Sequence, residues 1–142
     1  MSHSERLPGE IETLRRLRRY RADRAERALR EAKRSQQALV AHIEQAQDTL
    51  EKTREEEARQ SAQLLSEHQG QVVSFQALKS WGRKEQSLSA GTRREEGQLQ
   101  QLQGQREQRE VEVGLAQKHV TLCLRQVEKL QELANLLTQE AI

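Results

Sequence analysis

Apolar residues recur along this chain at alternating steps of three and four residues, in two separate stretches. This spacing averages about 3.5 residues and predicts the buried seam of a left-handed coiled coil. The first seam comprises Ala22, Ala25, Leu29, Ala32, Gln36, Leu39, Ile43, Ala46 and Leu50. The second comprises Leu99, Leu102, Arg106, Arg109, Val113, Ala116, Val120, Cys123, Val127, Leu130, Ala134 and Leu137. The pattern therefore predicts two long helices, each with one buried stripe.

Both seams change at their outer ends. Near the N-terminus, Ile11, Leu14 and Leu17 lie about one residue off the register of the first seam, which predicts that the buried face rotates there. Near the C-terminus, additional leucines widen the second stripe: Leu115, Leu122, Leu124, Leu133 and Leu136. A wider stripe indicates a further neighbour or a partner protein.

The segment between the stretches carries the signals of a helix end and a helix start. Gly70 suits the C-cap of the first helix, and the hydroxyl of Ser74 suits the N-cap of the second. We therefore expect helices over about 10–68 and 75–140, joined by a tip over about 69–74. So short a connection makes the helices antiparallel, and a fold at Gly70–Gln71 places Leu29 opposite Val113.

These features predict an all-α fold, a long antiparallel two-helix coiled-coil hairpin, as a single coiled-coil domain over 1–142. Pro8 is the only proline, so nothing after it breaks a long helix. Apolar residues make up 34% of the chain and aromatic residues 2%, too little for a compact globular core. Disorder is the competing interpretation of so polar a chain, but the regular seam argues against it.

The net charge is +2, yet it is unevenly distributed. Residues 15–34 include ten basic and three acidic side chains, whereas 44–67 include three basic and seven acidic ones. Such asymmetry bears on partners rather than on the fold. Cys123 is the only cysteine, and neither a signal-peptide core nor a transmembrane stretch is evident. A cytoplasmic location without direct membrane insertion is the simplest expectation.

Catalytic and metal sites are not expected. His119 and Cys123 share a helix face at a spacing of four, but no second pair completes a zinc site. The simpler interpretation is that Cys123 is a small seam residue and His119 is exposed. A two-helix fold also offers little concavity for an active site. We therefore expect no enzyme activity, no cofactor and no metal.

Two segments are candidate docking surfaces. The basic run includes Arg15, Arg16, Arg18, Arg19 and Arg21. It suits docking on an acidic protein surface, simple solvated charge, or nucleic acid or membrane. Nucleic acid is disfavoured because aromatic residues for base stacking are lacking. The tip cluster comprises Val72, Val73, Phe75, Leu78 and Trp81. These side chains either close the hairpin by packing on each other or serve as binding anchors.

The chain resembles the YscO family of type III secretion proteins, which is related to the flagellar FliJ proteins. The resemblance rests on the arginine- and alanine-rich run from Leu14 to Ala32, on the segment from Val72 to Trp81, and on the overall length and layout. It implies a central stalk between the hexameric secretion ATPase and the cytoplasmic ring of the export gate, which promotes ATPase activity and export. Some members of the family also handle export chaperones.

The resemblance also implies where each partner docks. Arg15, Arg16, Arg18, Arg19 and Arg21 are expected at the ATPase end. Val72, Val73, Phe75, Leu78 and Trp81 are expected at the export-gate end. The protein would then be cytoplasmic, peripheral to the inner-membrane export apparatus, a monomer when alone, and would bind no nucleic acid. The alternative is a structural scaffold or chaperone-like adaptor that dimerises through its C-terminal apolar stripe.

Overall fold

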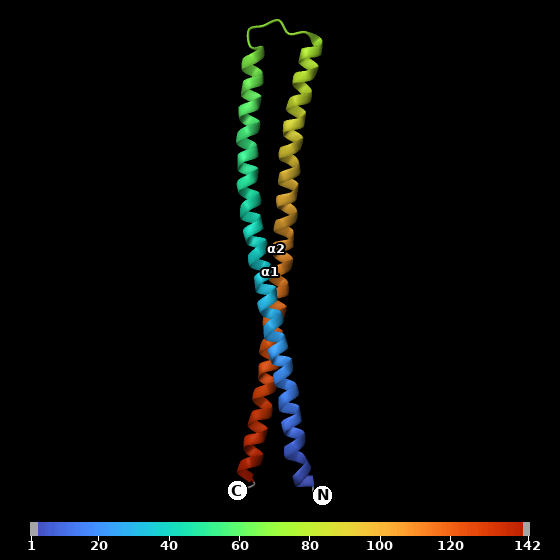
Figure 1. Cartoon of the computed structure of the whole chain (residues 1–142), viewed down its shortest axis with the longest axis vertical. Helices are drawn as coiled ribbons and strands as arrows, with labels where there is room; N and C mark the ends of the chain where they lie inside the picture. Colours follow the sequence, from blue (N-terminus) through green and yellow to red (C-terminus); the bar gives the residue numbers. More distant parts are fainter. Residues whose placement is uncertain (1–2, 141–142) are drawn as a thin grey trace. The chain divides into compact units, whose positions relative to one another are not determined.

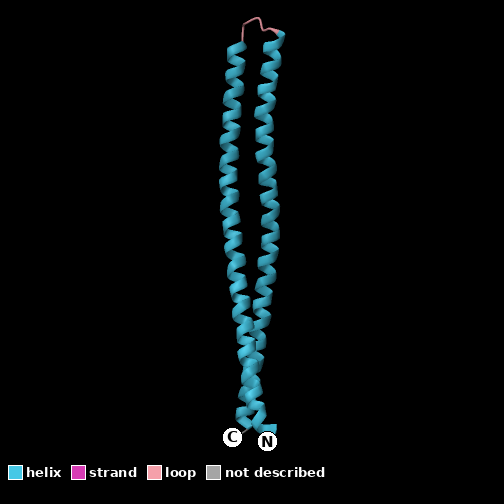
Figure 2. Cartoon of the chain, turned by 45° about the vertical axis from the view of Figure 1, so that its right-hand side comes forward, coloured by secondary structure: helices cyan, strands magenta, loops and turns pink. Residues whose placement is uncertain are grey.

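The structure, a computed structural model, describes the backbone of residues 3–140 and the side chains of residues 6–140. Helix α1 spans His3–His68 and helix α2 spans Phe75–Glu140, and no strand occurs within that range. The chain reverses through residues 69–74, so α2 runs back along α1 (Figure 1 and Figure 2). The predicted all-α fold, an antiparallel helical hairpin, is confirmed.

Both predicted caps at the turn are present. Gly70 has a φ of 75°, a left-handed conformation that glycine adopts without strain and that commonly ends a helix. The backbone N–H of Ala77 donates a hydrogen bond of 3.1 Å to the Ser74 hydroxyl. This bond satisfies one of the N–H groups that the first turn of α2 leaves without an intrahelical partner.

The start of α1 differs from the prediction. Helix α1 begins at His3 rather than near residue 10, so Pro8 lies inside it. Proline lacks only its own N–H and clashes only with the preceding turn, and here little more than one turn precedes it. The helix therefore continues through Pro8, and the Thr13 hydroxyl donates a bond of 3.0 Å to the carbonyl of Gly9 beyond it.

The helices contribute to two compact units. The terminal unit comprises residues 1–37 and 108–142, and the tip unit comprises residues 38–107. The core of the terminal unit is an apolar cluster of seam residues: Ala22, Ala25, Leu29, Val120 and Cys123, with Val113, Ala116 and Val127 packed against it. Alanine and cysteine side chains are small, so this seam brings the two backbones close together.

The tip unit has a more polar interior. From α1 it buries Leu39, Ile43, Leu50 and Leu64, the first three of which were predicted. From α2 it buries Thr92, whose hydroxyl donates a 2.5 Å hydrogen bond to Oε2 of Glu57. Leu99 and Leu102 are half-buried. Apolar side chains of α1 thus meet a mixed polar face of α2.

The expected rotation of the buried face near the N-terminus is wrong. Ile11 is buried, whereas Leu14 and Leu17 are each 43% exposed. Arg15 and Arg18 are half-buried in their place. The steps from Ile11 through Arg15 and Arg18 to Ala22 continue the alternation of four and three residues. The seam therefore keeps its register and includes two arginines.

The predicted pairing of the helices is also displaced. A fold at Gly70–Gln71 places Val127 opposite Arg15, but Arg15 bonds to Gln131, about one helical turn further along α2. The reason lies at the turn, where His68 stacks on Trp81 rather than on the first residues of α2. A fold at Gly70–Gln71 would place His68 opposite Ser74, so the offset is already present at the turn.

Candidate docking surfaces

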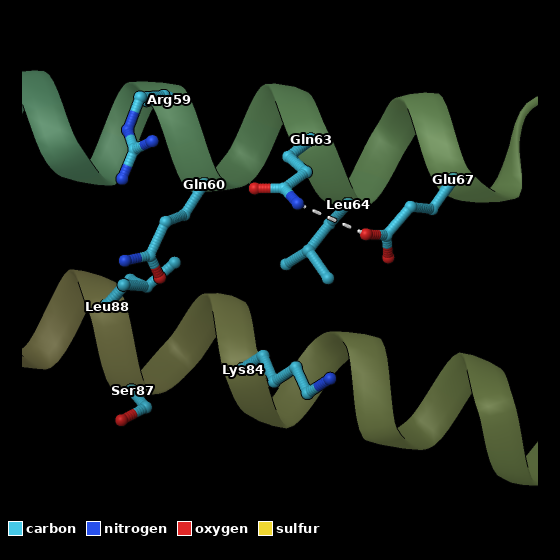
Figure 3. A pocket seen from close by; sticks show the side chains of 8 residues that line it. All are labelled: Arg59, Gln60, Gln63, Leu64, Glu67, Lys84, Ser87 and Leu88. Carbon is cyan, nitrogen blue, oxygen red and sulfur yellow. Dashed lines mark hydrogen bonds between the residues drawn. The ribbon is translucent and has the colours of Figure 1, made fainter.

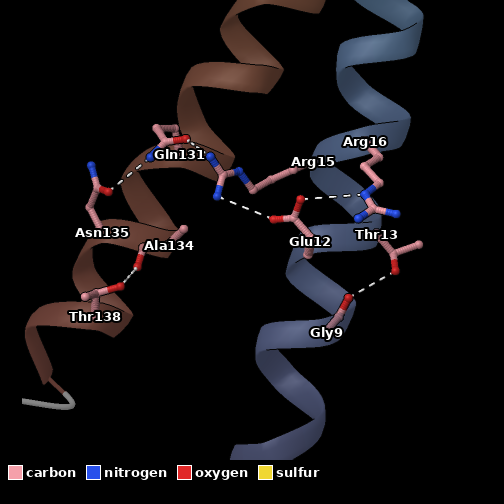
Figure 4. A network of polar contacts seen from close by, with 9 residues as sticks. All are labelled: Gly9, Glu12, Thr13, Arg15, Arg16, Gln131, Ala134, Asn135 and Thr138. Carbon is pink, nitrogen blue, oxygen red and sulfur yellow. Dashed lines mark hydrogen bonds and ion pairs between the residues drawn. The ribbon is translucent and has the colours of Figure 1, made fainter.

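The arginines of the basic segment fall into two groups, and the first group binds α2. Arg15 donates a hydrogen bond of 2.5 Å from Nη2 to Oε1 of Gln131, and its Nη1 lies 3.6 Å from Oε2 of Glu12 (Figure 4). Arg18 donates from Nη1 to the backbone carbonyl of Gln126 at 2.7 Å. Both guanidinium groups thus help to hold the terminal unit together.

The second group faces solvent. Arg16, Arg19 and Arg21 are exposed, and the side chain of Arg16 retains 81% of its accessible surface. Arg16 makes only a long contact of 3.7 Å with Glu12, on its own helix (Figure 4). Exposed ion pairs of this kind contribute little stability. These three guanidinium groups are therefore available to an acidic partner.

The tip cluster is likewise divided. Val72 is fully exposed, Phe75 is 70% exposed and Leu78 is 54% exposed. The ammonium group of Lys79 lies 4.5 Å from the centre of the Phe75 ring. Phe75 and Leu78 lie on the first turn of α2, and Val72 lies on the segment before it.

Val73 and Trp81 are half-buried, and contacts of Trp81 help to close the hairpin. The Trp81 ring stacks on His68 with a centroid separation of 4.9 Å, and its Nε1 donates a 2.9 Å bond to Oε1 of Glu85. His68 in turn contacts the carbonyl of Leu64 at 2.7 Å. Trp81 thus links the end of α1 to the start of α2.

An open groove in the tip unit lies between the two helices (Figure 3). Its lining consists of six polar or charged residues and two leucines: Arg59, Gln60, Gln63, Leu64, Glu67, Lys84, Ser87 and Leu88. A hydrogen bond from Arg59, together with one from Gln60, holds the pKa of Glu56 below its ordinary value. Arg59 and Gln63 bond to carboxylates of their own helix, so the groove holds no set of converging groups typical of a ligand site.

Cys123 is buried in the seam, as predicted, and His119 is exposed. The Cys123 Sγ lies 3.8 Å from Nε2 of His119. Among the described residues, no group of three or more potential ligands is placed to hold a metal ion. Within the same part of the chain, neither helix has a stretch long and apolar enough to span a bilayer.

The sequence matches the family model of the type III secretion protein YscO over residues 11–142. The chain belongs to the YscO family. The match begins at Ile11, a buried seam residue, and covers the basic segment, the tip, α2 and α1 from Ile11 onward. No significant match was found among curated proteins or solved structures. The resemblance drawn from the sequence is thus confirmed, and the protein is associated with type III secretion.

Proposed function

We propose that this YscO-family protein is the central stalk of a type III secretion system. It links the secretion ATPase hexamer to the cytoplasmic ring of the export gate and promotes ATPase activity and substrate export. It acts in the cytoplasm, at the periphery of the inner-membrane export apparatus, without catalysis or cofactor of its own. Export chaperones are further proposed partners.

The observation that supports this proposal is that the arginines of the basic segment form two groups, one bonded to α2 and one exposed to solvent. Arg15 and Arg18 bond to α2 and fix the backbone of the segment. Arg16, Arg19 and Arg21 are then presented to solvent from a supported helix. Arginine clusters steer association with acidic surfaces, and salt weakens that attraction. A stalk that stimulates an ATPase must contact one conformation of the ring more favourably than the others.

The direct test is charge reversal of the exposed group. We expect the triple variant Arg16→Glu, Arg19→Glu, Arg21→Glu to abolish stimulation of the secretion ATPase while circular dichroism shows unchanged helicity. Arg83→Glu with Lys84→Glu is the matched control, because both side chains are exposed in the tip unit. Full stimulation by the triple variant would refute the assignment.

The gate end is proposed to use the exposed part of the tip cluster, Val72, Phe75 and Leu78. We expect Phe75→Ala to weaken binding to the isolated gate ring by about 2 kcal/mol, the size of an interfacial anchor. Leu65→Ala is the control, because Leu65 is 55% exposed elsewhere in the same unit. Trp81→Ala should instead destabilise the turn, because it removes the stacking on His68.

The alternative function is a scaffold that dimerises through the C-terminal leucines. The exposure of Leu122, Leu133 and Leu136 favours it. Sedimentation equilibrium separates the two functions, because the stalk is expected to be a monomer when alone. A tight dimer that Leu122→Gln dissociates would favour the scaffold.

A further inference from the structure

The two helices of the tip unit expose opposite charges. Helix α1 exposes an acidic stripe of four carboxylates: Glu44, Asp48, Glu51 and Glu55. Helix α2 exposes a basic stripe of four cations: Lys79, Arg83, Arg93 and Arg94. Within residues 6–140, no ion pair engages any of these side chains. Charge in this unit is therefore segregated between the helices rather than mixed on each of them.

The heptad positions show that both stripes face away from the seam. With the buried residues Leu50 of α1 and Thr92 of α2 at position a, positions b, c and f lie on the outer side of each helix. At these positions α2 carries four basic residues and no carboxylate from Lys79 to Arg94. From Glu44 to Glu55, α1 carries four carboxylates and one basic residue, Lys52, at the same positions. The acidic and the basic stripe thus lie on opposite outer sides of the tip unit.

The carboxylates of α2 near the basic stripe are turned toward the seam. Glu85, at position a, accepts a hydrogen bond of 3.2 Å from the hydroxyl of Ser61 on α1. Glu96, at e, accepts one of 3.0 Å from Nη2 of Arg54 on α1. Glu95, at d, has its Oε2 atom buried. None of these three carboxylates occupies an outer position, so they do not neutralise the basic stripe on its own side of α2.

The basic stripe continues into the apolar end of the tip unit. The Lys79 ammonium group lies 4.5 Å from the centre of the Phe75 ring. Arg83 follows Lys79 by four residues, so the three side chains share one side of α2. Arg93 lies about 27 Å from Phe75 along the helix axis. A partner that covers this side of α2 therefore meets an aromatic ring at one end and positive charge along the rest.

We propose that the export-gate ring holds the tip unit with α2 toward it, in an apolar site for Phe75 that continues as a row of carboxylates along the basic stripe. The proposal rests on the docking of the tip at the gate ring proposed above, and it adds the chemistry and the orientation of that contact. The acidic stripe of α1 then points away from the gate carboxylates, which would repel it. The opposite charges of the two outer sides thus determine which helix faces the gate.

A second copy of this chain fits the basic stripe less well. Its acidic stripe would supply carboxylates, and exposed ion pairs alone contribute little to binding. From Ala38 to Ala62, the outer positions of α1 include no apolar residue larger than alanine. Pairing of the two stripes therefore gives the Phe75 ring no site to enter.

An anionic bilayer also fits the basic stripe less well. If Phe75 enters the bilayer end-on, Arg93 lies far beyond the screening length of about 10 Å. If α2 lies flat on the bilayer, it needs an apolar face, but its outer positions between Lys79 and Arg94 offer only Ala90. A protein wall that runs along α2 can contact the ring and the basic stripe together, and this favours the gate ring as the occupant.

The test compares two double charge reversals of equal magnitude. Arg83→Glu with Arg93→Glu reverses the basic stripe, and Glu51→Lys with Glu55→Lys reverses the acidic stripe. Binding of each full chain to the isolated gate ring is measured by biolayer interferometry at low and high salt, and circular dichroism checks helicity. We expect the first variant to bind at least about tenfold more weakly than the native chain, and the second no more weakly. The loss should shrink at high salt.

Phe75→Ala separates this proposal from the gate docking on which it rests. If Phe75→Ala weakens binding but reversal of the basic stripe does not, the tip docks at the gate without a row of carboxylates, and the proposal is overturned. Equal losses from the two reversals would also overturn it. Absence of binding by the native chain would refute the gate docking itself, and the proposal with it.

Two further measurements identify the other occupants. Co-sedimentation with phosphatidylglycerol vesicles that reversal of the basic stripe abolishes, with gate binding unchanged, would assign the stripe to a lipid surface. A low-salt dimer that either reversal dissociates, and that the two reversals together restore, would assign it to a second copy. Either result would overturn the proposal, and we expect neither.

Discussion

In the terminal unit, Ala22, Ala25, Leu29, Val120 and Cys123 close the seam as one apolar cluster, whereas in the tip unit Thr92 occupies a seam position and bonds to Glu57. Both units follow the same heptad repeat. Burial of apolar surface stabilises a seam more than a hydrogen bond that merely replaces one to water. The repeat therefore specifies that the helices pair in both units, but it does not make the two seams equally stable.

The number of glycines in α2 also differs between the two units and adds to this difference in stability. The α2 segment of the tip unit includes Gly82, Gly91, Gly97 and Gly104, whereas that of the terminal unit includes only Gly114. Each glycine in a helix interior costs about 1 kcal/mol relative to alanine. We infer that local opening begins in the tip unit, while the terminal unit keeps its proposed docking groups fixed.

The largest expected effect is the loss of a buried leucine from the terminal unit. Leu130 is 3% exposed, and Leu130→Ala should lower the free energy of unfolding by about 3 kcal/mol, through lost burial and the cavity left behind. Denaturant unfolding followed by circular dichroism measures it. Leu133→Ala, at an exposed position three residues away, should change stability by less than about 0.5 kcal/mol. Equal losses would contradict the assigned seam.

The next largest effect on stability is expected when glycines of the tip unit are replaced by alanine. A Cβ added at Gly97 or Gly104 meets no atom within 4 Å, so Gly97→Ala with Gly104→Ala should stabilise the tip unit by about 2 kcal/mol. Slower amide hydrogen exchange within residues 38–107 would report it. Gly70→Ala is the opposite control, because the φ of 75° at Gly70 strains any other residue. No change in exchange would argue against the expected difference between the units.

A smaller effect is expected at the polar contact of the tip unit. Thr92→Val removes the hydroxyl that donates a hydrogen bond to Glu57. This change should lower the free energy of unfolding by about 1 kcal/mol. Adding Glu57→Leu should recover that loss, since two apolar partners leave no polar group unsatisfied. Thr121→Val is the control, because its hydroxyl bonds only to Gln117 on the same helix. A double variant as unstable as Thr92→Val would refute this role for the contact.

The smallest effect is expected at the exposed ion pair between Arg54 and Glu96, with a separation of 3.0 Å. Their side chains are 58% and 43% exposed, so Arg54→Ala should cost at most about 0.5 kcal/mol. The cost should vanish at high salt, because salt screens exposed charges. Thermal unfolding at low and high salt measures both values. A salt-independent loss above that size would mean that the pair is shielded from solvent.

The sequence predicted the parts of the fold that depend on short-range patterns. Seam positions such as Ala22, Ile43 and Cys123 follow from the heptad repeat, and the caps at Gly70 and Ser74 follow from backbone chemistry. The pairing of the helices did not follow, because it depends on how the turn is built. The bond between Arg15 and Gln131 and the stacking of His68 on Trp81 reveal the offset.

The candidate docking residues were predicted as groups, but their individual roles were not. Arg15 and Arg18 were grouped with the solvent-facing arginines because the buried face was predicted to rotate onto Leu14 and Leu17 there. The steps of four, three and four residues from Ile11 through Arg15 and Arg18 to Ala22 continue the seam. This spacing could have distinguished the two seam arginines from the exposed ones. Likewise, the sequence placed Trp81 with Phe75, and only the fold shows that one packs and the other is exposed.

Every docking surface proposed above depends on α1 and α2 pairing within one molecule so that Ala22 meets Cys123. The most direct measurement is oxidation of the Ala22→Cys variant with a small-molecule oxidant, which joins the new thiol to that of the native Cys123 in a disulfide because both positions belong to one buried cluster. We predict an efficient intramolecular product that migrates as a monomer. Arg19→Cys, which a fold at Gly70–Gln71 would place opposite Cys123, should cross-link poorly. Preferential cross-linking of Arg19→Cys, or products that join two chains, would contradict the account.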